Sequence, residues 1–168
     1  MPVTFFEGFM GIAVSNLRVH VIHPTLIYLG CHSARAEALL IGGAACQSAL
    51  GAVLTDRSGH GLYRIAEQRH QKVWDQHLAL DPDLASKVRG LDSQHAFLSA
   101  PHLELTVNLR YSTAIAWMLI EAAGNKLPDC HDLMGLGQIW RQVFQPQGQA
   151  RDFLNAWLSC VGSLNQAA

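Results

Sequence analysis

The sequence predicts a mainly α-helical domain, α+β at most, with a small β-like patch near residues 55–65. Apolar residues recur at spacings of three and four in several segments, which is the period of an amphipathic helix. Serine, aspartate, proline and glycine residues stand where these segments begin and end. The chain has 168 residues, of which 49% are hydrophobic, and this is enough for a substantial core. We therefore interpret residues 1–168 as a single domain.

The segment 33–54 is predicted to form the central helix. Ser33 is suited to cap it, because a serine hydroxyl can accept a hydrogen bond from a free N–H of the first turn. One stripe of this helix holds residues at alternating spacings of four and three, namely Ala36, Leu40, Gly43, Gln47, Leu50 and Leu54. Gln47 is the polar member of the stripe, and small residues surround it. It is either a core glutamine bonded to backbone groups or a residue that looks into a cleft.

The segments next to the central helix are less regular. Residues 1–16 are apolar but interrupted by glycines, and we expect a docking segment or a loose helix there. Residues 17–29 predict a short helix with Pro24 at a kink or at a new start. Turn residues at 56–61 lead into Gly61–Ile65, for which we expect a strand or an extended wall of a cleft.

Boundary residues predict further helices in the rest of the chain. Asp81 and Pro82 mark a restart, with aspartate as the cap and proline at the first helical position. Gly124 closes a long helix that begins at Pro101 and extends through Glu121. The other expected segments are a helix at 66–80, a short helix that ends near Gly90, a polar loop at 91–100, and helices at 133–144 and 151–161.

Charge and hydropathy argue against nucleic acid as a partner and against a membrane-spanning segment. The formal net charge is −1 and no basic stripe appears, whereas nucleic-acid binding depends on the neutralisation of phosphates. No segment approaches the ~18 consecutive apolar residues of a membrane span. The N-terminal segment lacks a basic region and contains Glu7, so we expect no signal peptide and a protein that is cytoplasmic on synthesis.

No motif predicts a metal, a cofactor or a disulfide. The four cysteines form no Cys-x-x-Cys pair, and we expect reduced thiols. Histidine is abundant, yet the sequence contains no His-Glu-x-x-His and no close Cys/His cluster. His70 and His77 are seven residues apart and share a helix face, but we interpret them as ordinary surface histidines.

Four segments match motifs of one protein family in their order and spacing. Residues 44–51 look like its Glu-Ser motif, and Gly61–Ile65 looks like its Gly-Leu-Tyr-Gln-Met element. Residues 104–111 look like its Asn-hydrophobic-x-x-Tyr helix segment, and residues 136–148 look like its late Trp…Tyr-Asn…Gly element. Together they resemble the lysozyme-like superfamily, in particular the phage-type relatives of soluble lytic transglycosylases. The resemblance spans residues 20–158 and implies a lysozyme-like core with a cleft between the central helix and Gly61–Ile65.

The resemblance implies a role on the glycan strands of peptidoglycan, or on muramyl oligosaccharides. Relatives cleave these strands with a glutamic acid that protonates the glycosidic oxygen, and Gln47 stands at its position. An amide side chain cannot give up a proton at useful pH, so general acid catalysis from this position is lost. The second motif departs as well, because Arg64 replaces a glutamine and Ala66 replaces an acidic residue. The residues expected to contact the glycan are Ser48, Gly61, Tyr63, Arg64, Asn108 and Tyr111.

Three explanations of Gln47 stay open. The protein is a non-catalytic relative, or an active glutamic acid was engineered to glutamine to trap substrate, or Glu67 has taken over as the acid. The function we expect is that of a phage or prophage lysozyme-like protein that acts on or binds peptidoglycan, packaged in a virion with other virion proteins, its catalysis impaired by Gln47. If catalytic, it is a lytic transglycosylase or muramidase that uses one carboxyl group and neither metal nor cofactor. The alternatives are a non-enzymatic structural component of a virion and a small helical interaction protein.

Overall fold

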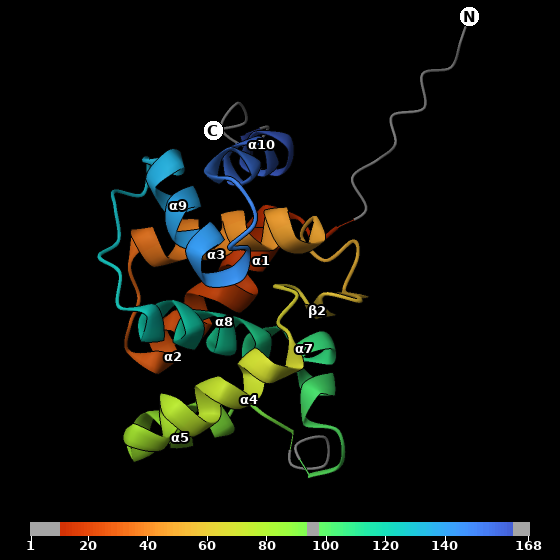
Figure 1. The fold of residues 1–168 in the computed structure, drawn as a ribbon, viewed down its shortest axis with the longest axis vertical. Helices are drawn as coiled ribbons and strands as arrows, with labels where there is room; N and C mark the ends of the chain where they lie inside the picture. Colours follow the sequence, from red (N-terminus) through yellow and green to blue (C-terminus); the bar gives the residue numbers. More distant parts are fainter. Residues whose placement is uncertain (1–10, 94–97, 163–168) are drawn as a thin grey trace, which may run out of the picture.

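The structure is a computed structural model that describes residues 11–93 and 98–162. It confirms the predicted mainly α fold, with a small β-hairpin (Figure 1). In chain order the elements are α1 (Val14–Leu17), the π-helical turn η1 (Arg18–Ile22), α2 (His23–Leu29), α3 (Ala34–Ser48), β1 (Thr55–Asp56), β2 (Gly59–His60), α4 (Glu67–Gln76), the 3₁₀ turn η2 (Leu78–Leu80), α5 (Pro82–Arg89), the 3₁₀ turn η3 (Pro101–Leu103), α7 (Glu104–Val107), α8 (Leu109–Ala123), α9 (Leu133–Phe144) and α10 (Ala150–Cys160).

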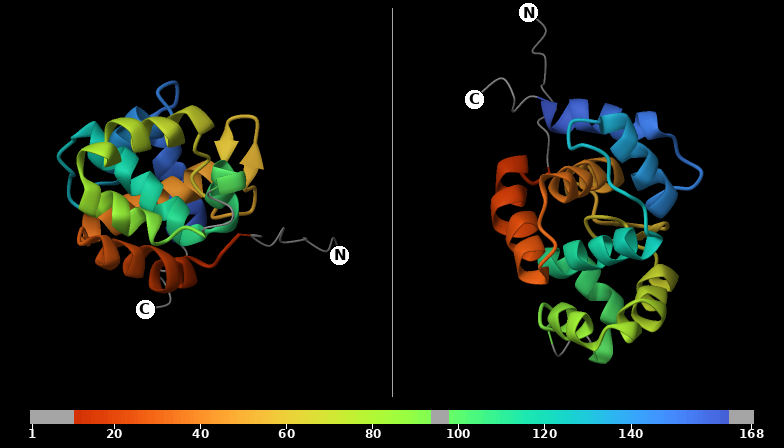
Figure 2. Two further views of the ribbon diagram at one scale, coloured as in Figure 1. Left: turned by 90° about the horizontal axis from the view of Figure 1, so that it is seen from below. Right: turned by 90° about the vertical axis from the view of Figure 1, so that its left-hand side faces the viewer.

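Helices α3 and α8 lie in the middle of the molecule, and the other helices pack around them (Figures 1 and 2). Helices α9 and α10 cover one end, where α10 packs against both α9 and α3. Helices α4 and α5 cover the opposite end, and α4 packs against α8. The buried apolar side chains of these helices join into a continuous core. The core therefore fixes the positions of the segments that carry the candidate site.

Helix α3 confirms the predicted start of the central helix but not its predicted end. The Oγ atom of Ser33 caps the helix by accepting a hydrogen bond of 3.0 Å from a backbone N–H of the first turn. The predicted extent 33–54 is wrong, because the helix ends at Ser48. Ala49 and Leu50 follow with left-handed φ angles of 49° and 54°, which no α-helix accommodates. The Leu50 side chain is fully buried, and its burial offsets the cost of this tight reversal.

The helix predicted at 17–29 is present as the irregular run α1, η1 and α2. Its middle is the π-helical turn Arg18–Ile22, which lies just before Pro24. Proline has no N–H and its ring crowds the carbonyl group four residues earlier, which explains why the helix widens there. Gly30 ends α2 with a φ of 77°, an angle that glycine adopts without strain. Most of the predicted segment 1–16 lies outside the described residues.

The helix predicted from Pro101 to Glu121 is wrong in its middle, because the chain breaks at Asn108. This residue is extended, with φ −119° and ψ 96°, and it separates α7 from α8. Its side-chain oxygen accepts a hydrogen bond of 3.0 Å from the N–H of Tyr111 and so caps α8. Asn108 and Tyr111 are therefore linked by a helix cap. Gly124 closes α8 as predicted.

The other predicted helix boundaries are close to those observed. Helix α9 matches the predicted range 133–144, and α10 begins one residue before the predicted range 151–161. Asp81 caps α5 with its side chain, as expected. The helix predicted at 66–80 is α4 followed by η2. Residues 94–97 of the predicted polar loop lie outside the described residues.

The predicted β-like patch is the hairpin of β1 and β2 together with the turns that follow it. The segment Gly61–Ile65 forms turns rather than a strand, and Ile65 returns to pair with His60. Gly61 has a φ of 81°, and a Cβ atom there would overlap the carbonyl group of Leu105 in α7. Glycine is therefore required where the hairpin region meets α7.

The cysteines and the helix lengths agree with two further expectations. All four cysteines are free thiols. Burial raises the pKa of Cys31 to about 11 and that of Cys46 to about 12, so both thiols are protonated at neutral pH. Within the described part of the chain, every helix is too short or too polar to cross a lipid bilayer.

Candidate functional site

Gln47 lies in the last turn of α3 and is buried, with 6% of its surface exposed. Its amide nitrogen donates a hydrogen bond of 3.1 Å to the carbonyl oxygen of Tyr63. Its amide oxygen accepts a hydrogen bond of 3.2 Å from the side chain of Gln145. Of the two alternatives for Gln47, the structure therefore shows the core glutamine, because both ends of the amide have partners.

Ser48, the next residue, also joins the end of α3 to the turns that begin at Gly61. Its hydroxyl donates to the carbonyl oxygen of Leu62 at 2.6 Å and accepts from the N–H of Gly51 at 3.0 Å. The side chain is buried, so these bonds satisfy a polar group that would otherwise be costly to bury. Gln47 and Ser48 together hold the end of α3 against the turns that begin at Gly61.

Three of the four segments that carry the family resemblance meet at Gln47 and Ser48, and the fourth packs beside them on Gly61. Residues 44–51 and 61–65 are joined by the bonds of Gln47 and Ser48. Residues 136–148 reach the same place through Gln145. Residues 104–111 pack directly on Gly61. These contacts between distant parts of the chain bring the segments into one region.

Tyr63 and Tyr111, which we expected in a groove with Gln47, are both packed inside the molecule. Their exposed fractions are 1% and 0%, so neither ring presents a face on which a sugar can stack. The hydroxyl of Tyr63 lies 3.1 Å from that of Thr113, and burial raises the pKa of Tyr63. The structure thus shows both tyrosines as packing residues, and a binding role for them stays a prediction.

Arg64, which is partly buried, and Glu67, which is exposed, lie beside the hairpin. Arg64 has a left-handed φ of 46° and forms an ion pair of 2.6 Å with Asp56. Glu67 begins α4, and its carboxylate lies 3.1 Å from the imidazole of His60. Glu67 lines a hollow of about 350 Å³ together with residues 56–60, 66 and 68. Gln47 is buried and Glu67 is exposed, so the two candidates for an acid lie in different surroundings.

Asn108 belongs to a partly buried polar network that the sequence did not reveal. Its amide donates to the carboxylate of Glu104 at 2.9 Å, and the hydroxyl of Ser93 donates to the same carboxylate at 2.7 Å. Burial opposes the charge on Glu104, but the hydrogen bonds from Ser93, Asp92 and Asn108 outweigh it and lower the pKa of Glu104. Burial and the neighbouring Glu104 raise the pKa of Asp92 to about 7. The oxygens of Asp92 are buried, so this carboxyl pair is not open to a substrate.

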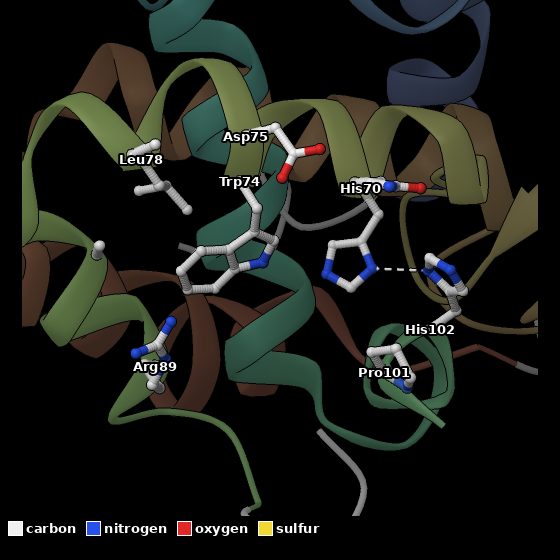
Figure 3. A pocket seen from close by; sticks show the side chains of 10 residues that line it. His70, Trp74, Asp75, Leu78, Arg89, Pro101 and His102 are labelled. Carbon is white, nitrogen blue, oxygen red and sulfur yellow. Dashed lines mark hydrogen bonds between the residues drawn. The ribbon is translucent and has the colours of Figure 1, made fainter. Parts of the chain in front are cut away.

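A pocket of about 480 Å³ opens between α4, α5 and η3 (Figure 3). The indole of Trp74 occupies its middle, with Arg89 on one side and His70 on the other. The guanidinium of Arg89 lies 5.4 Å from the centre of the Trp74 ring, within the range of a cation–π interaction. The lining residues are His70, Gln71, Trp74, Asp75, Leu78, Ala79, Ala85, Arg89, Pro101 and His102. The pocket therefore combines an aromatic surface with polar groups at its edge.

A chain of hydrogen bonds runs from Trp74 to His102 along the wall of this pocket. The Trp74 N–H donates to the hydroxyl of Tyr111 at 3.0 Å, and that hydroxyl lies 2.6 Å from Nε2 of His70. Nδ1 of His70 lies 2.9 Å from Nδ1 of His102. Every proton in the chain has an acceptor if Tyr111 donates to Nε2 of His70 and Nδ1–H of His70 donates to His102.

The interpretation of His70 as a surface histidine is wrong, because only 2% of it is exposed. Burial, followed by the charges of His102 and His60, lowers the pKa of His70 to about 4. The ring is therefore neutral at pH 7, as the hydrogen-bond chain requires. His77 is half-buried and lies 3.6 Å from Glu121.

The sequence did not predict this pocket, although the residues of one wall have the spacing of a helix face. His70, Trp74 and Leu78 recur at a spacing of four, which places them on one face of a helix. Arg89 and His102 come from segments more than ten residues away in the sequence, and no local pattern links them to that face. The tertiary packing of α4, α5 and η3 brings them together.

Comparisons with known proteins do not assign the chain to a family. No protein-family model matches it, and neither the curated proteins nor the solved structures include a match. The geometry described above and the sequence motifs are therefore the basis for the functional proposal.

Proposed function

We propose that this protein is a lysozyme-like protein that binds the glycan strands of peptidoglycan and does not cleave them efficiently. One observation carries the proposal: Gln47, at the position of the family's general acid, is buried with both ends of its amide hydrogen-bonded. Such a side chain neither supplies a proton nor stands free to reach a substrate. The meeting of the four motif segments around Gln47, Ser48 and Gly61 supports a lysozyme-like arrangement that has lost its acid.

The surroundings of Gln47 suit an amide better than a carboxylate. The bond from its nitrogen to the carbonyl oxygen of Tyr63 needs a donor, which an ionised glutamate lacks. The bond from Gln145 needs an acceptor at position 47, and both a glutamine and a glutamate there would provide one. This match favours a glutamine that belongs to the protein over one introduced to trap a substrate.

Glu67 is a weak substitute for the missing acid. A general acid of a glycosidase works from surroundings that keep its carboxyl group protonated, such as an apolar pocket. The side chain of Glu67 is 60% exposed and pairs with His60. Glu67 therefore lacks such a pocket, and its contact with His60 instead joins the hairpin region to α4.

We place glycan binding in the pocket around Trp74. Its volume of about 480 Å³ is within the usual range of small-ligand sites. The apolar face of a sugar ring packs on an indole, and its hydroxyl groups bond to polar side chains. Gln71, Asp75 and Arg89 supply such groups at the edge of the pocket. The buried rings of Tyr63 and Tyr111 offer no comparable surface.

A titration with N-acetylglucosamine oligosaccharides and muramyl oligosaccharides, followed by NMR, tests binding. We expect the largest shifts at the residues that line the pocket, and loss of at least about tenfold in affinity in Trp74→Ala. The matched control is Gln142→Ala, which alters a separate hollow between α4, α8 and α9 and should keep the affinity. If neither oligosaccharide shifts any signal, glycan binding is refuted, and the structural virion component or interaction protein is favoured.

Turbidity and muropeptide assays on purified peptidoglycan test catalysis. We expect no lysis by the protein as it stands and little by Gln47→Glu, because the side chain at position 47 is buried between Tyr63 and Gln145. Addition of Arg64→Gln and Ala66→Glu should release more anhydro-muropeptides, detected by mass spectrometry. Lysis by the unaltered protein at rates typical of lysozymes would contradict the proposal. If Glu67→Gln then abolished that lysis, Glu67 would be the acid.

A further inference from the structure

Two histidines and a glutamate meet away from the pocket, where α2 turns into α3. His23 is the first residue of α2, His32 lies in the connection, and Glu37 lies in the first turn of α3. The Oε1 atom of Glu37 lies 2.7 Å from Nδ1 of His23 and 2.9 Å from Nε2 of His32. The three atoms all lie within 4.8 Å of one another. The side chain of Glu37 is 15% exposed, whereas those of the histidines are 49% and 33% exposed.

We propose that His23, His32 and Glu37 form a binding site for a divalent transition metal, with Zn²⁺ as the best match. Two imidazole nitrogens and one carboxylate oxygen are a common donor set for zinc and leave a fourth position for water. Neighbouring ligand atoms around a tetrahedral zinc ion are about 3.3 to 3.6 Å apart, as follows from bonds of about 2.0–2.2 Å. The two observed separations, 2.7 and 2.9 Å, are shorter than these by about 0.4 to 0.9 Å. The exposed histidine rings have room to move apart.

The surrounding groups define the chemistry of the site further. Arg18 lies 4.0 Å from the second carboxylate oxygen of Glu37, so it orients the carboxylate but also repels a cation. Cys31 is not among the ligands, because its thiol points to the carbonyl oxygen of Leu26. Metal binding requires that each imidazole present a lone pair, so the protons now shared with Glu37 move to the other ring nitrogen or to solvent.

A metal ion in this site would tie α2 to α3. The ligands come from the first residue of one helix, the connection and the first turn of the next. Because such a site does not exist in the unfolded chain, metal binding stabilises the folded state. The site lies on residues that the proposed glycan binding does not use, so the two proposals are independent.

Calorimetric titration of the full chain with Zn²⁺ tests the site. We expect one ion per chain, a higher melting temperature with zinc, and a loss of at least about tenfold in affinity in both His32→Ala and Glu37→Gln. Arg18→Ala should bind zinc about threefold more tightly, because it removes a cation next to the carboxylate. This gain distinguishes the site from non-specific binding to surface histidines.

Two control variants make the result decisive. His20→Ala removes an exposed histidine of η1 that takes no part in the site, and it should leave the affinity unchanged. His131→Ala removes a member of a second cluster of possible metal ligands among the described residues, Asp129, Cys130 and His131, and this variant too should bind zinc normally. Unchanged affinity in both His32→Ala and Glu37→Gln, or loss of binding in His131→Ala alone, would overturn the proposal.

Discussion

Tyr111 joins residues that are far apart in the sequence through one buried hydroxyl group. It accepts a hydrogen bond from the indole of Trp74 and contacts the ring of His70. Both partners line the candidate pocket, although Tyr111 itself is fully buried. The buried hydroxyl therefore helps to position two pocket residues, although Tyr111 does not line the pocket itself.

Replacement of Tyr111 by phenylalanine should destabilise the protein. The change removes the acceptor of the Trp74 N–H and the partner of His70 Nε2, and unsatisfied buried groups of this kind cost about 1–3 kcal/mol each. Urea denaturation at pH 7 measures the loss. Tyr28→Phe is the control, because Tyr28 is 41% exposed and its change should stay within about 0.5 kcal/mol. Equal stabilities for the two variants would contradict the role of this hydroxyl.

At the scale of the element, the end of α3 decides where the candidate site forms. The helix stops after Gln47 and Ser48, and the left-handed residues Ala49 and Leu50 turn the chain back. A helix continued to residue 54 would carry the following turns away from the Gln47 amide. The bonds to Leu62 and Tyr63 depend on this early stop.

Glycine at position 49 should stabilise the protein. A left-handed conformation costs a residue with a side chain about 1–2 kcal/mol, whereas glycine adopts it freely at some cost in chain entropy. We expect Ala49→Gly to gain about 0.5–1 kcal/mol in thermal or urea denaturation. Ala122→Gly, at an exposed position in the last turn of α8, should instead lose up to about 1 kcal/mol. A loss of stability in both variants would show that the turn carries no strain.

At the scale of the whole molecule, two adjacent glycines govern how the C-terminal helices pack on α3. A Cβ atom at Gly42 would overlap the ring of Phe153 in α10, whose side chain is fully buried. A Cβ atom at Gly43 would make an ordinary contact of 3.5 Å with Trp140 in α9. The two positions differ because α10 approaches the backbone of α3 more closely than α9 does at this point.

Substitution of the two glycines by alanine should therefore have opposite effects. Gly42→Ala should lose about 1–3 kcal/mol, because a well-packed core does not accept an extra methyl group without shifts. Gly43→Ala should gain up to about 1 kcal/mol, because alanine is the better residue in a helix interior. Differential scanning calorimetry of both variants gives the comparison. If Gly42→Ala proved as stable as Gly43→Ala, the packing of α10 on α3 would differ from that described.

Part of the candidate site was predictable from the sequence. Gln47 stood out as a polar residue in an apolar stripe, and the motif order indicated that Gly61–Ile65 lies near it. The sequence did not reveal that Gln145 completes the hydrogen bonding of Gln47, because the two residues are 98 positions apart. It also gave no sign that His102 meets His70. Such contacts depend on how whole helices pack, and local spacing does not encode them.

The sequence by itself determined the helix class, most helix starts and the helix stops at glycine. Ser33, Asp81 and Gly124 act on backbone groups within a few residues, so their effects are readable in the local sequence. Only the tertiary structure decided that α3 stops at Ser48, that the chain breaks at Asn108 and that the pocket forms around Trp74. At Ser48 and Asn108, burial or a hydrogen bond from a distant segment outweighs the local helical tendency, which is worth less than about 1 kcal/mol per residue. The pocket depends on how three separate segments pack, which no local tendency encodes.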